Sequence, residues 1–395
     1  MNVGDYFCSH RAARTDGNGS NRRGMKTLRN LFSRPARRTI EFLRLGLICA
    51  ALPLPVLSAE VKLLNVSYDP TRELYTEINS LFADQYKSTH GVSVTIEQSH
   101  SGSSKQARSV IDGLKADVVT LGASWDITAI ERAGLIKPGW EKKLPYNAAP
   151  FTSIVCFLVR KGNPKHIKDW SDLTRPDVQV IAPNPKTGAA ARWAFLAFWG
   201  ATAKAKTHDL STQAGLKEAE QAARDAKSFP IYQDAEARAT IEKFYNHNVP
   251  VLDTGARGAT VTFAQKHLGD VLINWENEVW LAMEEFGQDK FDVIYPSTSI
   301  LGELPVAVVD EVVDKKGTRQ VAEAYLKFLY TPEVQETVAQ LHYRPHDVSV
   351  LQKYSADFPN IPLFTIDEAF GGWEKAQTAF FNEGALFDQI YRPTQ

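Results

Sequence analysis

Cysteine is scarce in this sequence: 395 residues contain three, and two of these, Cys8 and Cys49, precede residue 60. The third, Cys156, lies in the apolar run 154–159, a setting typical of a buried structural thiol rather than a nucleophile or a metal ligand. Residues 60–395 therefore have no partner for an internal disulfide, and packing has to supply their stability.

The common motifs of nucleotide binding and hydrolysis are also missing. The chain has no Gly-Lys dipeptide, no G-x-G-x-x-G and no G-x-S-x-G, which excludes Walker-type phosphate binding, the dinucleotide fingerprint and the nucleophile elbow. His342 and His346 have H-x-x-x-H spacing, but Pro345 disfavours the helix that would bring both onto one face. His100 lies among serines, where a solvated turn is favoured over a Ser/His pair. No cofactor and no metal site is predicted.

Net charge is close to zero, with 45 Lys and Arg against 46 Asp and Glu. This average hides a split: residues 1–59 hold 10 basic and 3 acidic residues, a net +7, and residues 60–395 hold 35 and 43, a net −8. Nucleic acid and anionic membranes are bound through Lys and Arg patches. The acidic body therefore argues against both as partners.

The basic segment has the order of a secretory signal. A basic stretch from Met25 precedes the apolar run 43–57 and the small residues Ser58 and Ala59, and this order is typical of a cleavable leader. The run is shorter than the ~20 residues that span a bilayer, although a retained membrane anchor remains the alternative. We predict that residues 1–59 are removed on export to the periplasm, and translation starts at Met1 or at Met25.

The body alternates predicted strands and helices, which indicates an α/β fold with parallel sheets. Its 336 residues exceed one usual core of ~250–300 residues, so two domains are expected. We predict a first lobe over 60–149, a second lobe over 150–278, and a return to the first lobe with C-terminal helices over 279–395.

Three predicted strands end in a small or polar turn that opens a helix. The turns contain Asp69, Ser103 and Gly188. In a parallel sheet such turns lie at the carboxyl ends of the strands, where ligands bind, and helix N-termini attract anions. The turns favour a shared site for a small dianion, although most α/β proteins have turns of this kind.

Several segments together identify a family. They include SYDPTRELY (67–75), SHSGSSKQARSV (99–110), APNPKTGAAARW (182–193), LDTGARGATVTF (252–263) and GDVLINWENE (269–278). In this order they resemble the periplasmic sulfate-binding proteins of ABC importers, and the similarity extends over nearly all of residues 61–393. The resemblance implies a type II periplasmic binding protein, in which two doubly wound α/β lobes close about a hinge around one oxyanion.

The resemblance also implies a set of ligand donors. Backbone N–H groups would come from Asp69, Ala189, Ala190 and Ala256. Ser103 would donate through its N–H or its hydroxyl, and Trp275 through its indole, although by position alone Trp275 is typical of a packing residue. Gly188 also belongs to the predicted site, but it replaces a serine that is common in the family and so lacks a hydroxyl.

A site made of donors suits sulfate, which has no proton to donate at neutral pH, whereas hydrogen phosphate needs an acceptor. The Asp69 carboxylate is predicted to fold back onto the N–H groups of its own helix. Arg192 and Arg257 are predicted to bond to backbone or carboxylates rather than to the anion.

The sequence therefore predicts a monomeric, non-enzymatic carrier that delivers sulfate to a membrane ABC permease. A thiosulfate carrier of the same family is the first alternative. A cleft enzyme that transfers sulfo or phospho groups is the second alternative, from a different class.

Overall fold

The computed structural model describes residues 60–210, 212–225 and 231–391. The chain divides into two units, residues 1–56 and residues 57–395, and the described residues all belong to the second. The predicted leader, residues 1–59, lies outside the described residues.

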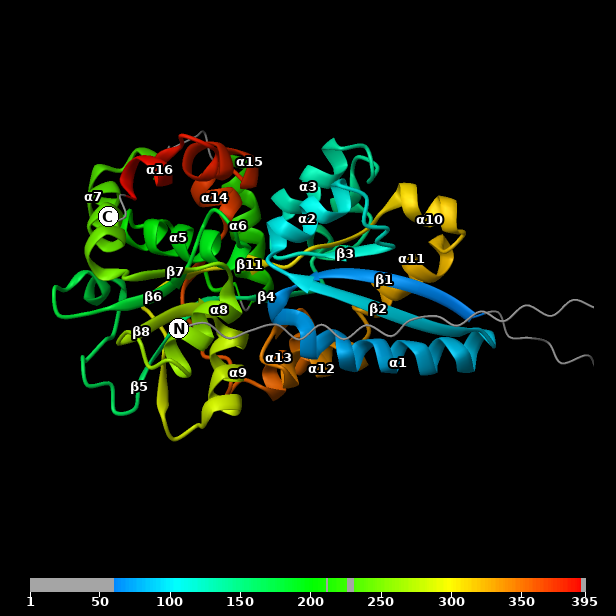
Figure 1. Ribbon diagram of the computed structural model, residues 1–395, viewed down its shortest axis with the longest axis horizontal. Helices are drawn as coiled ribbons and strands as arrows, with labels where there is room; N and C mark the ends of the chain where they lie inside the picture. The colour runs from blue at the N-terminus through cyan, green and yellow to red at the C-terminus, as the bar shows by residue number, and fades with distance from the viewer. Residues whose placement is uncertain (1–59, 211, 226–230, 392–395) are drawn as a thin grey trace, which may run out of the picture. The chain divides into compact units, whose positions relative to one another are not determined.

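The first lobe is built on a four-stranded sheet of order β12-β3-β1-β2 (Figure 1). The strands β1 (Glu60–Tyr68), β2 (Ser93–Ser101) and β3 (Val118–Thr120) are parallel, and β12 (Val306–Val308) is antiparallel to β3. The chain thus leaves this sheet after β3 and returns to it only with β12.

Helices cover both faces of this sheet because its strands alternate apolar side chains between the faces. Leu63 packs in the cluster that contains α1 (Arg72–His90), and Val66 packs in the cluster that contains α2 (Ser103–Ile111) and α3 (Ser124–Arg132). Figure 1 shows α1 on the side of the sheet opposite to α2 and α3. The remaining helices of this lobe are η2 (Trp140–Lys142), α4 (Pro145–Ala148), α10 (Asp310–Lys316), α11 (Arg319–Phe328), α12 (Pro332–Gln340) and α13 (Val348–Lys353).

The second lobe is built on a five-stranded mixed sheet of order β7-β6-β8-β5-β9. Three strands are parallel: β7 (Val251–Asp253), β6 (Val180–Pro183) and β8 (Val271–Trp275). The strands β5 (Val155–Arg160) and β9 (Phe291–Ile294) complete the sheet, with β5 antiparallel to both of its neighbours.

Side chains of β5 also alternate between two apolar clusters. Phe157 packs with α5 (Ala189–Thr202), and Cys156 packs with α8 (Ala256–Ala264) and α9 (Glu276–Phe286) on the other face. Every residue of α5 from Ala189 to Gly200 is buried, which makes it the central helix of the lobe. The Cys156 thiol is free and buried, as predicted.

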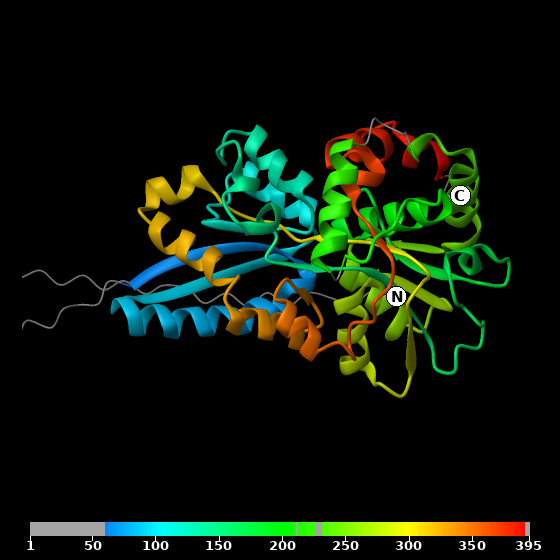
Figure 2. The same ribbon diagram turned by 180° about the vertical axis from the view of Figure 1, so that it is seen from behind.

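The C-terminal segment packs on α5. Phe380 stacks at a tilt against Phe195, with ring centroids 5.2 Å apart, and edge-on against Trp199 at 4.8 Å. Figure 2 shows the same C-terminal helices over the second lobe, seen from behind. This lobe also contains η3 (Trp170–Thr174), α6 (Gln213–Asp225), η4 (Ile231–Gln233), α7 (Ala235–Lys243), η5 (Phe244–Asn248), α14 (Ile366–Phe370), α15 (Trp373–Ala376), η6 (Gln377–Phe381) and α16 (Leu386–Ile390).

Short strands lie where the chain passes between the lobes. A three-stranded sheet has the order β11-β4-β13, with β4 (Phe151–Ser153) antiparallel to both β11 (Gly302–Glu303) and β13 (Arg344–Pro345). A further pair joins β10 (Ser299–Ile300) to β14 (Leu363–Phe364).

Strand pairing differs from the lobe boundary predicted at residue 278. β9 pairs with β5, so the chain stays in the second sheet through Ile294 and reaches β12 of the first sheet only at Val306. The sequence does not show this because the antiparallel partner of β9 lies more than a hundred residues earlier.

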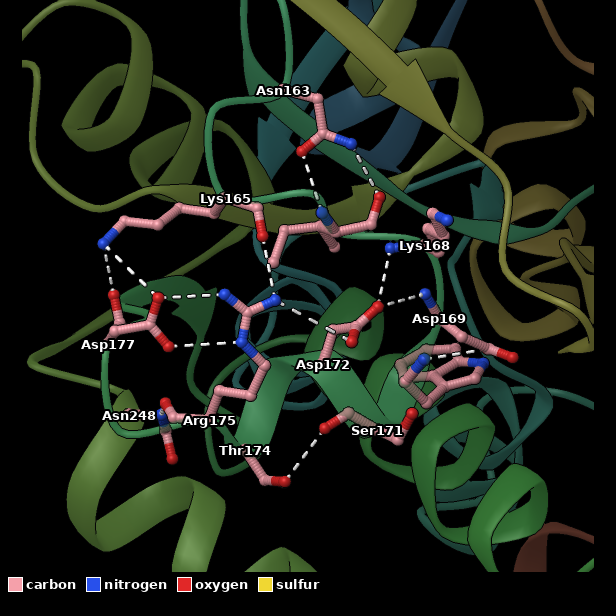
Figure 3. Close-up of polar contacts among 12 residues, drawn as sticks. Asn163, Lys165, Lys168, Asp169, Ser171, Asp172, Thr174, Arg175, Asp177 and Asn248 are labelled. Atoms are coloured by element: carbon pink, nitrogen blue, oxygen red, sulfur yellow. Dashed lines mark hydrogen bonds and ion pairs between the residues drawn. The ribbon is translucent and has the colours of Figure 1, made fainter.

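Residues 163–177 form a polar loop on the second lobe (Figure 3). Asp169 and Asp172 make a reciprocal capping box at the start of η3. Arg175 donates to the Lys165 carbonyl at 2.8 Å and to the Asp177 carboxylate at 2.9 Å. These charged groups bind one another and hold the loop together.

Candidate anion site

Five helices begin at or within a few residues of the carboxyl ends of strands in the two sheets. Their N-cap residues are Tyr68, Gly102, Gly188, Gly255 and Trp275. None of these residues caps its helix with a side-chain hydrogen bond. The first N–H groups of a helix have no partner within the helix. The first N–H of α9, that of Glu276, donates to the Ile154 carbonyl at 2.9 Å. The other four ends present donors and a partial positive charge.

The predicted site residues occupy these positions. Asp69 opens the 3-10 turn η1 (Asp69–Thr71), which leads into α1, and Ser103 opens α2. Ala189 and Ala190 are the first two residues of α5, and Ala256 is the first of α8. The helix that Ala256 begins has nine residues.

Close approaches at glycines bring these ends together. A Cβ placed on Gly102 would lie 3.0 Å from the Thr187 carbonyl oxygen, directly before the start of α5. A Cβ on Gly188 would lie 3.8 Å from the Cα atom of Gly255, and one on Gly255 would lie 3.7 Å from Oδ2 of Asp69. The helix ends of α2, α5, α8 and η1 therefore converge at the boundary of the two lobes.

Trp275 carries an unpaired donor at this point. Its side chain is 1% exposed, and its indole Nε1 has no hydrogen-bond partner among the described residues. Asn274 holds it near α8: the Asn274 amide donates to the Ala256 carbonyl at 3.0 Å, and its oxygen accepts from the Trp275 backbone N–H at 2.9 Å. Buried donors are usually paired in native proteins, and this indole is one of the buried polar atoms of the described residues that have no partner.

The neighbouring indole is different. Trp193 lies 6.1 Å from Trp275 between ring centroids and donates to the Gly122 carbonyl at 2.7 Å. Two adjacent buried indoles thus have different roles: one joins the lobes, and the other keeps a free donor.

The Ser103 hydroxyl is engaged by the protein itself. It donates to Oδ2 of Asp126 at 2.5 Å and accepts from the Gly122 N–H at 3.1 Å. From the sequence, Ser103 was expected to donate to the anion through its N–H or its hydroxyl. Because the Ser103 hydroxyl donates its proton to the hydrogen bond with Asp126, the backbone N–H is the donor of Ser103 that remains for a ligand.

Asp126 also forms an ion pair between the lobes. Arg192 of α5 contacts its Oδ2 through Nη2 at 2.6 Å, and both side chains are almost fully buried. Arg257 pairs with Glu285 on the surface of the second lobe. Both arginines thus bind carboxylates, as predicted, and that neither contacts the anion stays a prediction.

The predicted capping role of Asp69 is wrong. Tyr68 is the N-cap of η1, and no side chain caps this turn. The Asp69 carboxylate instead lies 3.5 Å from Nη2 of Arg72, close to Gly255 across the lobe boundary. Burial raises the pKa of Asp69 above its usual value, with Arg72, Lys105 and Arg257 acting against that shift.

Gly188 offers no free donor, which the sequence did not reveal. Its backbone N–H donates to the Asn184 carbonyl at 3.2 Å and closes the turn that precedes α5. Since glycine has no side chain, the donors at this helix end are those of Ala189 and Ala190.

Glu278 is a buried acid close to the site, and it was not among the residues predicted from the sequence. It accepts from the Thr260 hydroxyl at 3.1 Å, and burial raises its pKa to about 7, with Arg257 acting in the opposite direction. No local pattern distinguishes it from Glu276, which forms a buried ion pair with Arg344 at 2.7 Å.

The two histidines with H-x-x-x-H spacing do not form a site together. His342 contacts Glu284 at 3.2 Å, and His346 contacts the Ala149 carbonyl at 2.9 Å. Within residues 60–210, 212–225 and 231–391, no group of three His, Cys, Asp or Glu side chains is placed to hold a metal ion. In the same ranges no helix has the length and apolar character needed to cross a bilayer.

Two α/β lobes linked by several passages of the chain, with helix ends facing one another at their boundary, are the architecture of a two-lobed solute-binding protein. The family model of the bacterial extracellular solute-binding proteins matches residues 63–344. The sulfate-binding protein of Escherichia coli is 52% identical over 335 residues, which are 85% of this chain and 94% of that protein.

Two further relatives support this class. The thiosulfate-binding protein of Pseudomonas aeruginosa is 45% identical over 332 residues, 84% of this chain and 92% of that protein. The solved structure of the sulfate-binding protein SubI from Mycobacterium tuberculosis is 29% identical with a TM-score of 0.67, covering 82% of this chain and 100% of its own. This chain therefore belongs to the bacterial extracellular solute-binding proteins, in the group that contains the sulfate- and thiosulfate-binding proteins.

Proposed function

We propose that this protein is the sulfate-binding component of an ABC importer, which captures the dianion between its lobes and delivers it to a membrane permease. The observation that carries the proposal is the unpaired, buried indole N–H of Trp275 beside uncapped helix ends. The donors are the N–H groups of Asp69, Ser103, Ala189, Ala190 and Ala256, together with this indole.

Selectivity for sulfate over hydrogen phosphate follows because the proposed ligand-binding groups are all hydrogen-bond donors. Sulfate accepts at all four oxygens, whereas hydrogen phosphate must also donate a proton. An unmatched polar group in a buried site costs ~1–3 kcal/mol, which corresponds to about a five- to 150-fold preference for sulfate. The Asp69 carboxylate is an acceptor beside the proposed site, and Arg72 contacts it at 3.5 Å.

Thiosulfate is the second candidate ligand. It shares the tetrahedral shape and the double charge of sulfate, and a relative that is 45% identical is named for binding it. The proposed site has no feature that rejects it.

A carrier and not an enzyme is proposed because the relatives are named as binding proteins and because the Ser103 hydroxyl is held by a carboxylate that is itself paired with Arg192. Hydrolysis of a sulfate ester by the purified protein, lost in Ser103→Ala, contradicts this part of the proposal.

The protein is proposed to act as a periplasmic monomer after removal of residues 1–59. Membership of an extracellular family and the order of basic, apolar and small residues before Glu60 support the export and the cleavage. The mass and N-terminal sequence of the exported protein test the cleavage, and sedimentation tests the monomer.

Titration calorimetry on protein stripped of bound anions tests the ligand. We expect sulfate to bind at micromolar concentration or below, with molybdate and phosphate far weaker. A preference for phosphate, or no heat with micromolar sulfate, contradicts the proposal.

A further inference from the structure

We propose that Gly122 is the stop at which closure of the lobes ends, and that its contact with Ala189 sets the size of the oxyanion that this protein accepts. The inference rests on the proposed function and adds to it a residue outside the proposed donor set. Gly122 lies between β3 and α3 in the first lobe, and Ala189 is the first residue of α5 in the second lobe.

Gly122 and Ala189 approach each other more closely than two side chains can. A Cβ atom built on Gly122 would lie 2.8 Å from the Cβ atom of Ala189, a distance at which one of the two atoms has to move. Ala189 is buried, at 2% exposure. The lack of a side chain at position 122 therefore lets the start of α5 reach the backbone of the first lobe.

Neighbouring residues of α5 hold the same contact. Trp193, one turn further along the helix, donates its indole N–H to the Gly122 carbonyl at 2.7 Å. Arg192 donates to Oδ2 of Asp126 at 2.6 Å and to the Ser104 hydroxyl at 2.9 Å. Each of these bonds joins one lobe to the other, so all of them form only when the lobes meet.

Gly122 also connects the two half-sites, which are the proposed donors that each lobe contributes. Its N–H donates to the hydroxyl oxygen of Ser103, a proposed donor of the first lobe, at 3.1 Å. The methyl group that meets Gly122 belongs to Ala189, a proposed donor of the second lobe. Gly122 thus lies between one donor of each lobe, and the contact fixes the separation of the half-sites when closure ends.

A fixed separation discriminates between anions by size. Two-lobed binding proteins close by a hinge motion around their ligand, and closure here gains the contacts of α5 with the first lobe. A tetrahedral dianion larger than sulfate, such as molybdate, holds the lobes short of the stop and loses these contacts. Molybdate, like sulfate, has no proton at neutral pH, so a comparison of the two isolates size.

Calorimetric titrations with sulfate and with molybdate test the inference in the unaltered protein and in Gly122→Ala. The backbone of Gly122 does not have a positive φ, so it accepts alanine, and the added methyl group moves the stop outward. Because this overpacking is unfavourable in the closed form, we expect the Kd for sulfate to rise about five- to 150-fold. We expect the Kd for molybdate to rise less, so that the preference for sulfate falls.

The double variant Gly122→Ala with Ala189→Gly is the matched control. A Cβ atom at position 122 would also lie 3.2 Å from Cδ2 of Tyr68, a contact within the first lobe. Ala189→Gly relieves only the contact between the lobes, so we expect the double variant to recover most of the lost sulfate affinity. Thermal unfolding without ligand checks the fold of each variant. Ala189→Val enlarges the contact from the second lobe and gives the same test if Gly122→Ala does not fold.

The outcomes separate the inference from the function on which it rests. The inference is wrong if Gly122→Ala binds sulfate as tightly as the unaltered protein, if the double variant recovers no affinity, or if sulfate and molybdate lose affinity equally. In each of these cases the function stands when the unaltered protein binds sulfate. If the unaltered protein does not bind sulfate at micromolar concentration, the proposed function itself is wrong.

Discussion

Replacing Trp275 with phenylalanine removes the buried indole N–H donor of the proposed site and makes the aromatic side chain smaller. The indole Nε1 has no partner among the described residues, so the substitution breaks no hydrogen bond in the unliganded protein. With a dianion bound, the lost bond is charge-assisted and worth ~1.5–3 kcal/mol. We therefore expect the Kd for sulfate to rise about ten- to 150-fold.

The stability of the unliganded protein should change much less. Ring atoms of Trp275 lie 2.5 and 2.7 Å from a Cβ built on Gly302, so a smaller ring leaves a cavity there, which destabilises. Removing a buried, unpaired N–H acts in the opposite direction. Calorimetry gives the Kd, and urea unfolding gives the stability of the same preparation.

Trp199→Phe is the matched control. Trp199 is also fully buried, but its indole donates to the Ile231 carbonyl at 2.7 Å and lies ten residues into α5. This variant should lose stability and keep its sulfate affinity. The reasoning fails if Trp275→Phe binds sulfate as tightly as the unaltered protein, or if both variants lose affinity equally.

Two other substitutions test the groups around the site. Glu278→Gln should flatten the pH dependence of stability. Burial raises the pKa of Glu278 in the folded protein from 4.5 to about 7. Protonation of Glu278 therefore stabilises the fold fully below pH ~4.5, and about 3 kcal/mol of this stability is lost as the pH rises through 7. Urea midpoints at pH 5 and pH 8 measure this, and equal pH slopes in both proteins contradict it. Asp126→Asn leaves Arg192 buried without a counter-charge and should lower the free energy of unfolding by about 3–5 kcal/mol. A loss below 1 kcal/mol in chemical unfolding would show that the ion pair between the lobes is not important for stability.

Much of the architecture could be predicted because it depends on local patterns. Runs of apolar residues predicted strands such as β1, which contains Val66, and β5, which contains Phe157. Strand ends that lead into helices indicated an anion site. The structure places the residues chosen from those turns next to one another.

Side-chain partners at the site could not be predicted in the same way. The Ser103 hydroxyl is held by a residue 23 positions later, and Arg192 reaches back 66 residues to the same carboxylate. Asp69 was expected to cap its helix from propensity alone, but the N-cap position falls on Tyr68. A one-residue shift in a helix start is below the precision of sequence patterns.

The pairing of β4 with β11 has a consequence for how the lobes are held. Two separate passages of the chain are joined there by backbone hydrogen bonds, with Ser153 opposite Gly302 and Thr152 opposite Glu303, and a third passage follows α13. A protease that nicks one passage should leave the two halves together as one particle. The lobes are connected by a small sheet and not by a tether, so an intact peptide bond is not required at each passage.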